Sequence, residues 1–230
     1  MPFEHFPKAT LPFLKSIEKN NTKEWFDAHK DDYTNYILEP SRAFVEEMGE
    51  HLQALVPTIN AIPKINQSLF RIYRDTRFSK DKTPIKSKIG IIFWQGSDIR
   101  MQSSCFYLHF SPKELLIASG IRTFDPDLLA AYRDYIKVDK NRETLHHILE
   151  ELKTKGYTVE EPHYKRLPNG FSKELSLEYL ARMKAVAVYH KEKASLISDK
   201  KLIPELYSHY ENFLPLQQWL YTMSLTKTSD

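Results

Sequence analysis

Seven cationic side chains and only two acidic ones lie within residues 70–88, which read FRIYRDTRFSKDKTPIKSK. This basic segment carries an excess of five positive charges, which is larger than the +3 of the whole chain. The remainder holds 26 of the 33 Lys and Arg and 28 of the 30 Asp and Glu, so it is slightly acidic. Because the local field selects a charged partner, we expect an anion to bind here. The cations are Arg71, Arg74, Arg77, Lys80, Lys82, Lys86 and Lys88, and the acids are Asp75 and Asp81.

The spacing of the arginines around Asp75 favours an ordered site. Whether the backbone stays extended or turns helical after residue 72, at least one arginine side chain lies beside this carboxylate. A carboxylate accepts planar, paired hydrogen bonds from guanidinium groups and fixes their orientation. The remaining donors can then bind the phosphate, sulfate or carboxylate of a small ligand. The predicted ligand-binding residues of the segment are Arg71, Arg74, Asp75, Arg77, Lys82 and Lys86.

Three other interpretations of the basic segment stay open. As a hydrolase or phosphoryl-transfer enzyme, the protein would use Asp75 or Asp81 as a base while the arginines stabilise developing negative charge. As a nucleic-acid-binding protein, it would hold phosphates with its cations and stack bases on the aromatic side chains between them. As a structural clamp, the Arg–Asp network would join a strand to a loop and bind no ligand.

Signatures of metal, cofactor and nucleophile sites are weak. The nine histidines are scattered, and neither an HExxH motif nor a paired-cysteine spacing occurs, so we expect no metal site. With six glycines and neither GxGxxG nor a Walker pattern, we expect no cofactor. The single cysteine, Cys105, excludes an intrachain disulfide and lies in an apolar run, where we expect it to pack in the core.

The elements that must position the basic segment follow a helix–strand–helix order. We therefore predict an α+β fold, in which an antiparallel β-sheet packs with N-terminal and C-terminal helices in a single domain, residues 1–230, with a disordered tail at 226–230. The expected helices span 21–37, 41–55, 126–136, 141–156, 175–184 and 203–221, and the expected strands span 69–74, 88–94, 104–110, 114–121, 157–159 and 185–189.

Local signals sharpen some of these boundaries. Residues 105–110 are apolar or aromatic on both faces, which indicates a central strand. Asp125, followed by a proline, is a strong helix start, and Gly156 is a good helix end. Pro40 and Pro215 are expected to interrupt their helices.

The composition indicates a protein with a packed core, because 41% of the residues are hydrophobic and 13% are aromatic. The N-terminus lacks a basic region followed by an apolar run, and no apolar run approaches the length of a membrane span. We therefore expect a cytoplasmic protein without a membrane partner. The residue pattern does not predict an oligomeric state.

The basic segment resembles the signature of a known family. The run Arg71-x-x-Arg74-Asp75-x-Arg77-Phe78, followed by Asp81-Lys82, is similar to the central motif of the proteins grouped as domain of unknown function 2461. These are mostly bacterial proteins, and the resemblance implies no activity. It extends over nearly the whole chain through Asn20-Asn21, Trp25-Phe26, Lys30, Thr83-Pro84, Lys86, Pro126, Leu129, Arg133, Pro168, Gly170, Arg182 and Lys184.

Two positions stand out in this resemblance. Arg133 matches the family's later helix, so we add it to the candidate ligand-binding residues as a fourth guanidinium. Ile85 stands where the family usually has a tyrosine after the proline. A phenol that acts as a ligand or proton donor is therefore lacking here, whereas a packing role would survive the change.

Overall fold

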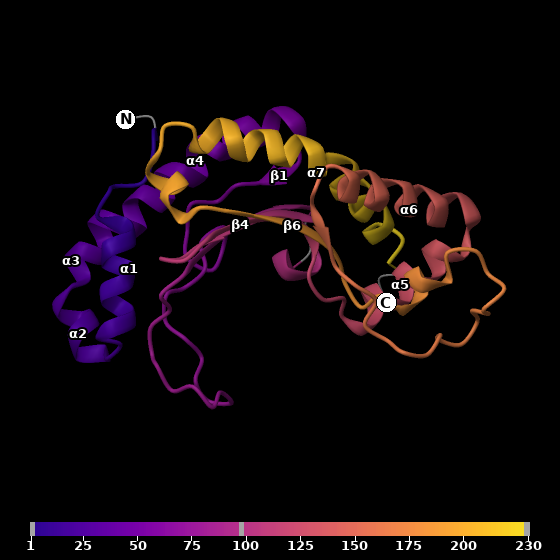
Figure 1. The fold of residues 1–230 in the computed structure, drawn as a ribbon, viewed down its shortest axis with the longest axis horizontal. Helices are drawn as coiled ribbons and strands as arrows, with labels where there is room; N and C mark the ends of the chain where they lie inside the picture. Colours follow the sequence, from indigo (N-terminus) through magenta and orange to yellow (C-terminus); the bar gives the residue numbers. More distant parts are fainter. Residues whose placement is uncertain (1–2, 97–98, 228–230) are drawn as a thin grey trace. The chain divides into compact units, whose positions relative to one another are not determined.

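The computed structural model describes residues 3–96 and 99–227 (Figure 1). Helices come first and last in the chain, and most of the strands lie between them. The early helical elements are α1 (Thr10–Lys19), α2 (Lys23–Ala28), α3 (Lys30–Tyr33), the π-helical turn η1 (Thr34–Leu38) and α4 (Glu39–Leu55). The later ones are α5 (Pro126–Lys137), α6 (Asp139–Thr154) and α7 (Leu202–Ser224), with short 3₁₀ turns η2 (Arg100–Gln102), η3 (Glu178–Arg182) and η4 (Ala194–Ser198).

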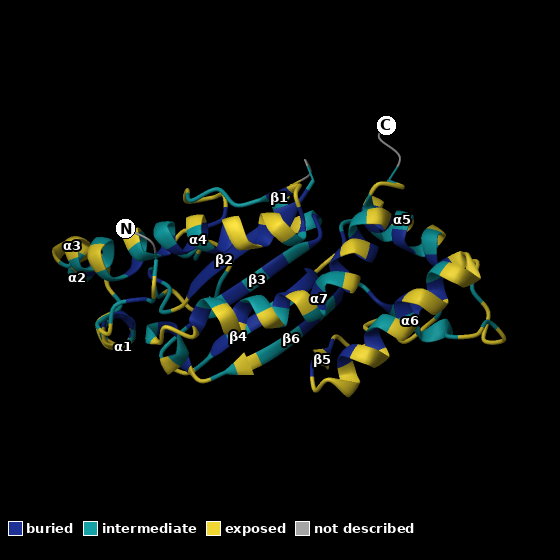
Figure 2. Cartoon of the chain, turned by 90° about the horizontal axis from the view of Figure 1, so that it is seen from above, coloured by how far each residue is buried: buried dark blue, intermediate teal, exposed yellow. Residues whose placement is uncertain are grey.

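Six strands form one antiparallel sheet in the order β1-β2-β3-β4-β6-β5. They are β1 (Ile59–Asn60), β2 (Ile89–Gln95), β3 (Cys105–Phe110), β4 (Leu115–Ile121), β5 (Thr158–Val159) and β6 (Val186–Glu192). The α+β prediction is confirmed. The apolar run at 105–110 is the central strand β3, in which buried and partly buried residues alternate, whereas β2 is buried throughout (Figure 2). At one edge, Val159 of β5 pairs with Val188 of β6.

Helix ends follow the local capping chemistry of the sequence. The Asp125 side chain accepts a hydrogen bond of 2.8 Å from the backbone N–H of Leu128, so α5 begins as predicted. Gly156 follows Lys155, the C-cap of α6, and has a φ of +87°, a conformation that glycine adopts without strain. The cap of α2 is Thr22, one residue after the expected start of the helix 21–37, and its hydroxyl accepts from the Trp25 N–H at 3.2 Å.

Some predicted elements are wrong. Residues 69–74 form no regular strand; instead, isolated bridges pair Leu69 with Ile91 and Tyr73 with Ile85. Pro40 does not break the chain's helical course, which runs from α3 through η1 into α4. Proline has no N–H for the Tyr36 carbonyl, which accepts instead from the Thr10 hydroxyl at 2.7 Å. The predicted interruption at Pro215 does not end α7, which continues to Ser224.

The chain divides into two compact units. The first comprises the chain up to Phe93, Tyr107–Ile117 and Lys191–His209, and the second comprises Trp94–Phe106, Ala118–His190 and the chain from Tyr210. Strands β2, β3, β4 and β6 and helix α7 contribute residues to both units. The expectation of a single domain stays a prediction.

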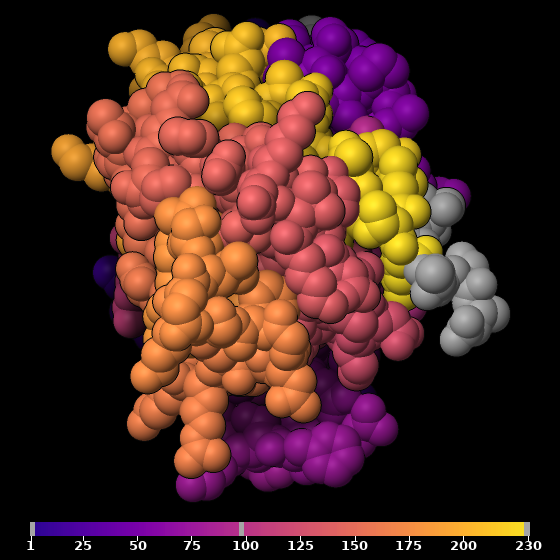
Figure 3. Space-filling view, turned by 90° about the vertical axis from the view of Figure 1, so that its right-hand side faces the viewer, coloured from indigo at the N-terminus to yellow at the C-terminus, as the bar shows by residue number. Residues whose placement is uncertain are grey.

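Each unit has an aromatic core of its own. In the first unit, the Phe6 ring lies 4.7 Å from that of Phe110 and 5.8 Å from that of Phe44, and all three side chains are buried. In the second unit, the rings of Phe106 and Tyr210 are 4.9 Å apart. Figure 3 shows that α5, α6 and the irregular segment after β5 form a broad part of the second unit's surface.

None of the helices within residues 3–96 and 99–227 combines the length and the apolar content that a membrane crossing requires. Residues 228–230 of the predicted disordered tail, 226–230, lie outside the described residues. Of its two described residues, Thr226 donates its backbone N–H to Met223, and the Lys227 ammonium lies 3.7 Å from the Asp125 carboxylate.

Candidate functional site

The basic segment belongs to the first unit and forms an irregular hairpin between β1 and β2. The N–H of Arg74 donates to the carbonyl of Pro84 at 2.8 Å, and the N–H of Lys86 donates to the carbonyl of Ile72 at 2.9 Å. Figure 1 shows the chain between β1 and β2, coloured purple, projecting away from β2 as a long loop. The cations therefore lie on a loop. Backbone hydrogen bonds join the two limbs of this loop near its base.

Asn21 anchors the base of this hairpin. Its amide oxygen accepts from the Ile85 N–H at 2.9 Å, and its amide nitrogen donates to the Ile85 carbonyl at 2.8 Å. The Ile85 side chain is buried, which is the environment of a packing residue. The Tyr73 ring also lies 5.5 Å from that of Phe26 in α2. The N-terminal helices thus hold the loop that carries the arginines.

Asp75 organises one group of cations. Its two carboxylate oxygens accept from Nε and Nη2 of Arg77 at 3.0 and 2.7 Å, and one of them also accepts from the Arg77 backbone N–H at 3.2 Å. Nη2 of Arg71 lies 3.9 Å from the same carboxylate. These bonds, first of all those from Arg77, hold the pKa of Asp75 well below its usual range. The expected Arg–Asp contact is confirmed.

Asp81 organises a second group across the tip of the hairpin. It accepts from the backbone N–H of Thr83 at 3.0 Å and from the Thr83 hydroxyl at 2.7 Å, and it pairs with Nη1 of Arg74. The same Nη1 donates to the Thr83 hydroxyl at 2.9 Å. The hydrogen bonds from Thr83 and Arg74 lower the pKa of Asp81 to about 2. Arg74 therefore joins the two limbs of the hairpin, and its partner is Asp81 rather than Asp75.

Two lysines of the segment bind backbone carbonyls, and two others extend into solvent. The Lys82 ammonium donates to the Thr76 carbonyl at 2.8 Å, and the Lys86 ammonium donates to the Arg71 carbonyl at 2.7 Å. Lys80 and Lys88 are exposed, and no carboxylate of the described residues pairs with them. Two acids cannot neutralise seven cations, so the positive charge of the segment faces solvent.

An exposed aromatic side chain lies beside these cations. Phe78 is 95% exposed, and the guanidinium carbon of Arg77 lies 5.8 Å from its ring centre. A solvated phenylalanine on a basic loop offers a flat apolar surface next to positive charge. Phe78 is one of the aromatic side chains between the cations that the nucleic-acid interpretation uses for stacking on bases. Its exposure was not predictable.

Arg133, which the family resemblance added to the site, belongs to the second unit. Its guanidinium carbon lies 5.4 Å from the ring centre of Tyr164. Its Nε is buried and has no hydrogen-bond partner among the described residues. The role of Arg133 in ligand binding stays a prediction.

The second unit contains a cavity of about 320 Å³. At its wall, Nδ1 of His146 lies 3.0 Å from the Tyr179 hydroxyl. Burial, together with the negative charges of Glu150 and Glu161, raises the pKa of Tyr179 to about 12. Because its lining holds three glutamates but only one lysine, the cavity does not suit an anion. The lining residues are His146, Leu149, Glu150, Lys153, Val159, Glu160, Glu161, Pro162, Tyr179 and Met183.

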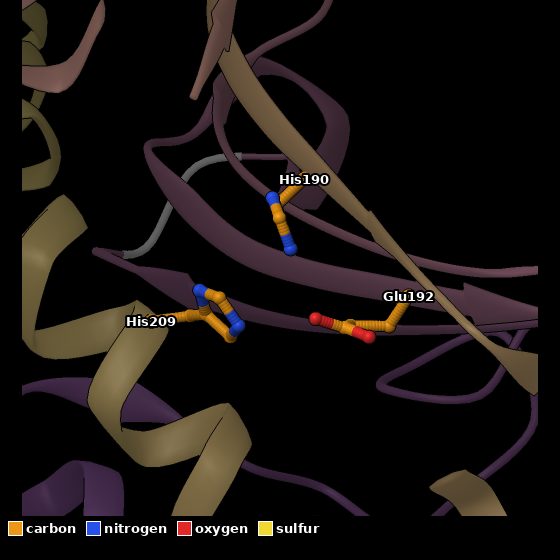
Figure 4. Close-up of side chains that lie close together, drawn as sticks. All are labelled: His190, Glu192 and His209. Atoms are coloured by element: carbon orange, nitrogen blue, oxygen red, sulfur yellow. The ribbon is translucent and has the colours of Figure 1, made fainter. Parts of the chain in front are cut away.

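A separate cluster of His and Glu side chains lies on β6 and α7. One ligand atom from each of His190, Glu192 and His209 lies within 4.8 Å of the other two (Figure 4). This cluster was not predicted from the sequence. Because side chains alternate between the two faces of a strand, His190 and Glu192 lie on the same face of β6. No sequence signal joins that pair to His209, which lies 17 residues further along the chain.

The chain matches the model of a known protein family. Residues 9–219 match the family described as "Conserved hypothetical protein (DUF2461)". No curated protein and no solved structure matches the chain.

Proposed function

The chain belongs to the DUF2461 family of conserved hypothetical proteins. We propose that it binds a phosphorylated or otherwise anionic ligand through the basic segment. The charge surplus of residues 70–88 carries the proposal, because seven cations are grouped around two acids on an exposed loop. The remainder of the chain is slightly acidic, so the attraction for an anion is concentrated in this segment.

The hydrogen bonds within the segment support a binding role for Arg71 and Arg77. Asp75 takes Nε and Nη2 of Arg77, which leaves Nη1 to donate to a ligand, and the Arg77 side chain is 77% exposed. Arg71 is also exposed and lies at the edge of the same carboxylate. A guanidinium that is held on one side by a carboxylate loses less freedom when it binds a second anion on the other.

The enzyme alternative has less support. Asp75 and Asp81 both have lowered pKa values, so both are ionised but weakly basic near neutral pH. A general base works best when its pKa is close to the working pH. The carboxylates are better suited to orienting the arginines than to accepting a proton, which favours binding over catalysis.

Replacing Arg77 by alanine tests the anion-binding proposal. The change removes one guanidinium and leaves Asp75 with its negative charge less compensated, so we expect affinity for pyrophosphate to fall at least about tenfold. Binding is measured by isothermal titration calorimetry at low salt, with Arg122→Ala in the second unit as a matched control that keeps full affinity. Equal binding by the Arg77 and Arg122 variants, or no binding by the unaltered protein, would refute the proposal for this ligand class.

Arg74→Ala separates binding from structure. Arg74 joins the hairpin limbs through Asp81 and Thr83, so its loss loosens the loop and weakens ligand binding indirectly. If Arg74→Ala increases proteolysis of the segment, while Arg71→Ala and Arg77→Ala leave the affinity for every tested ligand unchanged, then the Arg–Asp network is a structural clamp.

The exposure of Phe78 favours a second candidate function, which is binding of single-stranded nucleic acid. Bases stack on aromatic side chains beside phosphate-binding cations, at about 1–3 kcal/mol per base. We expect Phe78→Ala to weaken binding of a single-stranded oligonucleotide about fivefold to a hundredfold and to leave pyrophosphate binding unchanged. Fluorescence anisotropy at several salt concentrations measures the affinity, with Leu225→Ala, which removes an exposed apolar side chain of the second unit, as the control. Affinity that does not depend on salt, or that Phe78→Ala leaves intact, would exclude this candidate.

A further inference from the structure

We propose that His190, Glu192 and His209 form a binding site for a divalent first-row transition-metal ion. Each side chain offers one ligand atom, and the three atoms lie within 4.8 Å of one another. In Figure 4 both imidazole rings and the carboxylate are directed toward one shared space. Glu192 and His209 belong to the first unit, and the continuous strand β6 places His190 two residues before Glu192. None of the three belongs to the basic segment.

The alternation of β6 explains why His190 and Glu192 converge. Side chains at i and i+2 of a strand lie on the same face, and the residue between them lies on the other face. That residue is Lys191, whose ammonium lies 2.9 Å from the Glu114 carboxylate. Its positive charge is therefore paired on the opposite side of the strand and does not oppose a cation between His190 and Glu192.

Rigid surroundings support the three side chains. His209 lies within the long helix α7, between the fully buried residues Leu206 and Tyr210. The His190 ring lies 5.8 Å from the ring of Tyr157, whose hydroxyl accepts from the Asn212 side-chain amide at 3.1 Å. Ligands on strands and helices are held more precisely than ligands on loops.

The separation of the ligand atoms suits a metal ion. Metal–ligand distances of about 2.1 Å place two ligand atoms of a tetrahedral site about 3.4 Å apart. Atoms within 4.8 Å of one another therefore reach this geometry through side-chain rotations that move each ligand atom by about 1 Å. All three side chains are partly buried, so an ion can enter from solvent and yet lose much of its competing water.

The chemistry of the ligands selects the class of ion. Two imidazoles and a carboxylate, without a thiolate, suit Zn²⁺, Fe²⁺, Mn²⁺, Co²⁺ or Ni²⁺, and three protein ligands leave at least one position open. A closed structural zinc site would need a fourth protein ligand. The proposed site is therefore of the open type, in which water or an oxygen of a small ligand completes the coordination.

Metal titration of the full-length protein tests the site. The protein is first stripped with a chelator and dialysed, and Zn²⁺ and Mn²⁺ are then added separately in a calorimeter while thermal unfolding is followed in parallel. We expect one ion per chain for at least one of the metals and a rise in the unfolding temperature, because an ion that binds only the folded state stabilises it. His209→Ala and Glu192→Gln should each weaken binding at least about tenfold.

Matched variants distinguish this site from other histidines. His147→Ala removes an exposed histidine of α6 and should leave stoichiometry and affinity unchanged. Glu192→Gln keeps the side chain's shape, so metal-free Glu192→Gln should unfold near the temperature of the metal-free parent protein. Binding lost in His147→Ala but kept in His209→Ala and Glu192→Gln would overturn the proposal. So would the absence of binding in the parent protein, which would leave the cluster as a His–Glu ion-pair group.

Discussion

Arg142 shows how much a single buried guanidinium can organise. It lies on α6 and is 1% exposed. Its Nη1 donates to the carbonyls of Ile136 and Lys137, which are among the last of α5 and have no partner within that helix. Its Nε donates to the Ser176 carbonyl at 2.8 Å, and its Nη2 pairs with Asp139 at 2.6 Å. One side chain thus connects the end of α5, the start of α6 and a distant loop.

Removing this guanidinium should destabilise the protein strongly. We expect Arg142→Ala to lower the free energy of unfolding by about 3–5 kcal/mol, because the carbonyls of Ile136, Lys137 and Ser176 lose their donor and a large buried side chain is removed. Urea denaturation measures the loss, and Arg166→Ala, at an exposed position of the second unit, should change the midpoint little. Arg142→Lys should not restore stability, since one ammonium cannot reproduce the planar set of donors. A small effect of Arg142→Ala would mean that water replaces its bonds.

Residues of the same type have opposite roles in the basic segment and in α6. Arg77 is mostly exposed and binds a partly exposed carboxylate, whereas Arg142 is buried and binds mainly backbone carbonyls. Exposure decides which of them can meet a ligand. Arg71 and Arg77 are the more exposed of the predicted anion-binding arginines of the segment, whereas Arg74 pairs with Asp81 and Thr83, and its role in ligand binding stays a prediction.

At the scale of elements, the contact between β4 and β6 depends on a glycine. Gly120 has a φ of +127°, and a Cβ at this position would lie 2.2 Å from the Val186 carbonyl oxygen. The two strands are neighbours in the sheet, so their backbones approach each other closely at this point. Strand β6 also carries His190 and Glu192, which makes this contact relevant to the proposed metal site.

A pair of glycine variants tests this close approach. Gly120→Ala must move backbone atoms as well as strain φ, so we expect a loss of about 3 kcal/mol or more in the free energy of unfolding. Gly156→Ala has a φ of +87° but no atom within 4 Å of the added carbon, so we expect a loss of about 1 kcal/mol. Chemical denaturation of both variants gives the comparison, and equal losses would show that β4 and β6 can separate without cost.

At the scale of the whole molecule, charge is distributed unevenly along the chain. The basic segment has an excess of five positive charges, and the rest of the chain is slightly acidic. The cavity of the second unit is lined mainly by acidic and apolar side chains, and the cluster on β6 and α7 combines imidazoles with a carboxylate. These features suit ligands of different chemistry, so the ligand-binding proposals can be tested independently of one another.

Much of the secondary structure could be predicted because it depends on neighbouring residues. The run at 105–110 is largely apolar or aromatic, so it becomes the central strand β3, in which buried and partly buried residues alternate. Asp125 starts α5 and Gly156 follows α6 because capping satisfies backbone groups within a few residues. The charge surplus and the arginine beside Asp75 also follow from residues that are close in sequence.

Only the tertiary structure brings together residues that are distant in sequence. Asn21 stands at the start of the expected helix 21–37, but its side chain instead forms two hydrogen bonds with the backbone of Ile85, 64 residues away. The exposure of Phe78 and the burial of Arg142 depend on how the surrounding loops and helices pack, because neither residue type determines its own environment. The approach of His209 to His190 and Glu192 depends on how α7 lies against β6, and no local pattern encodes that contact. Sequence by itself therefore determined the fold class and the basic segment, and the tertiary structure decided which side chains meet.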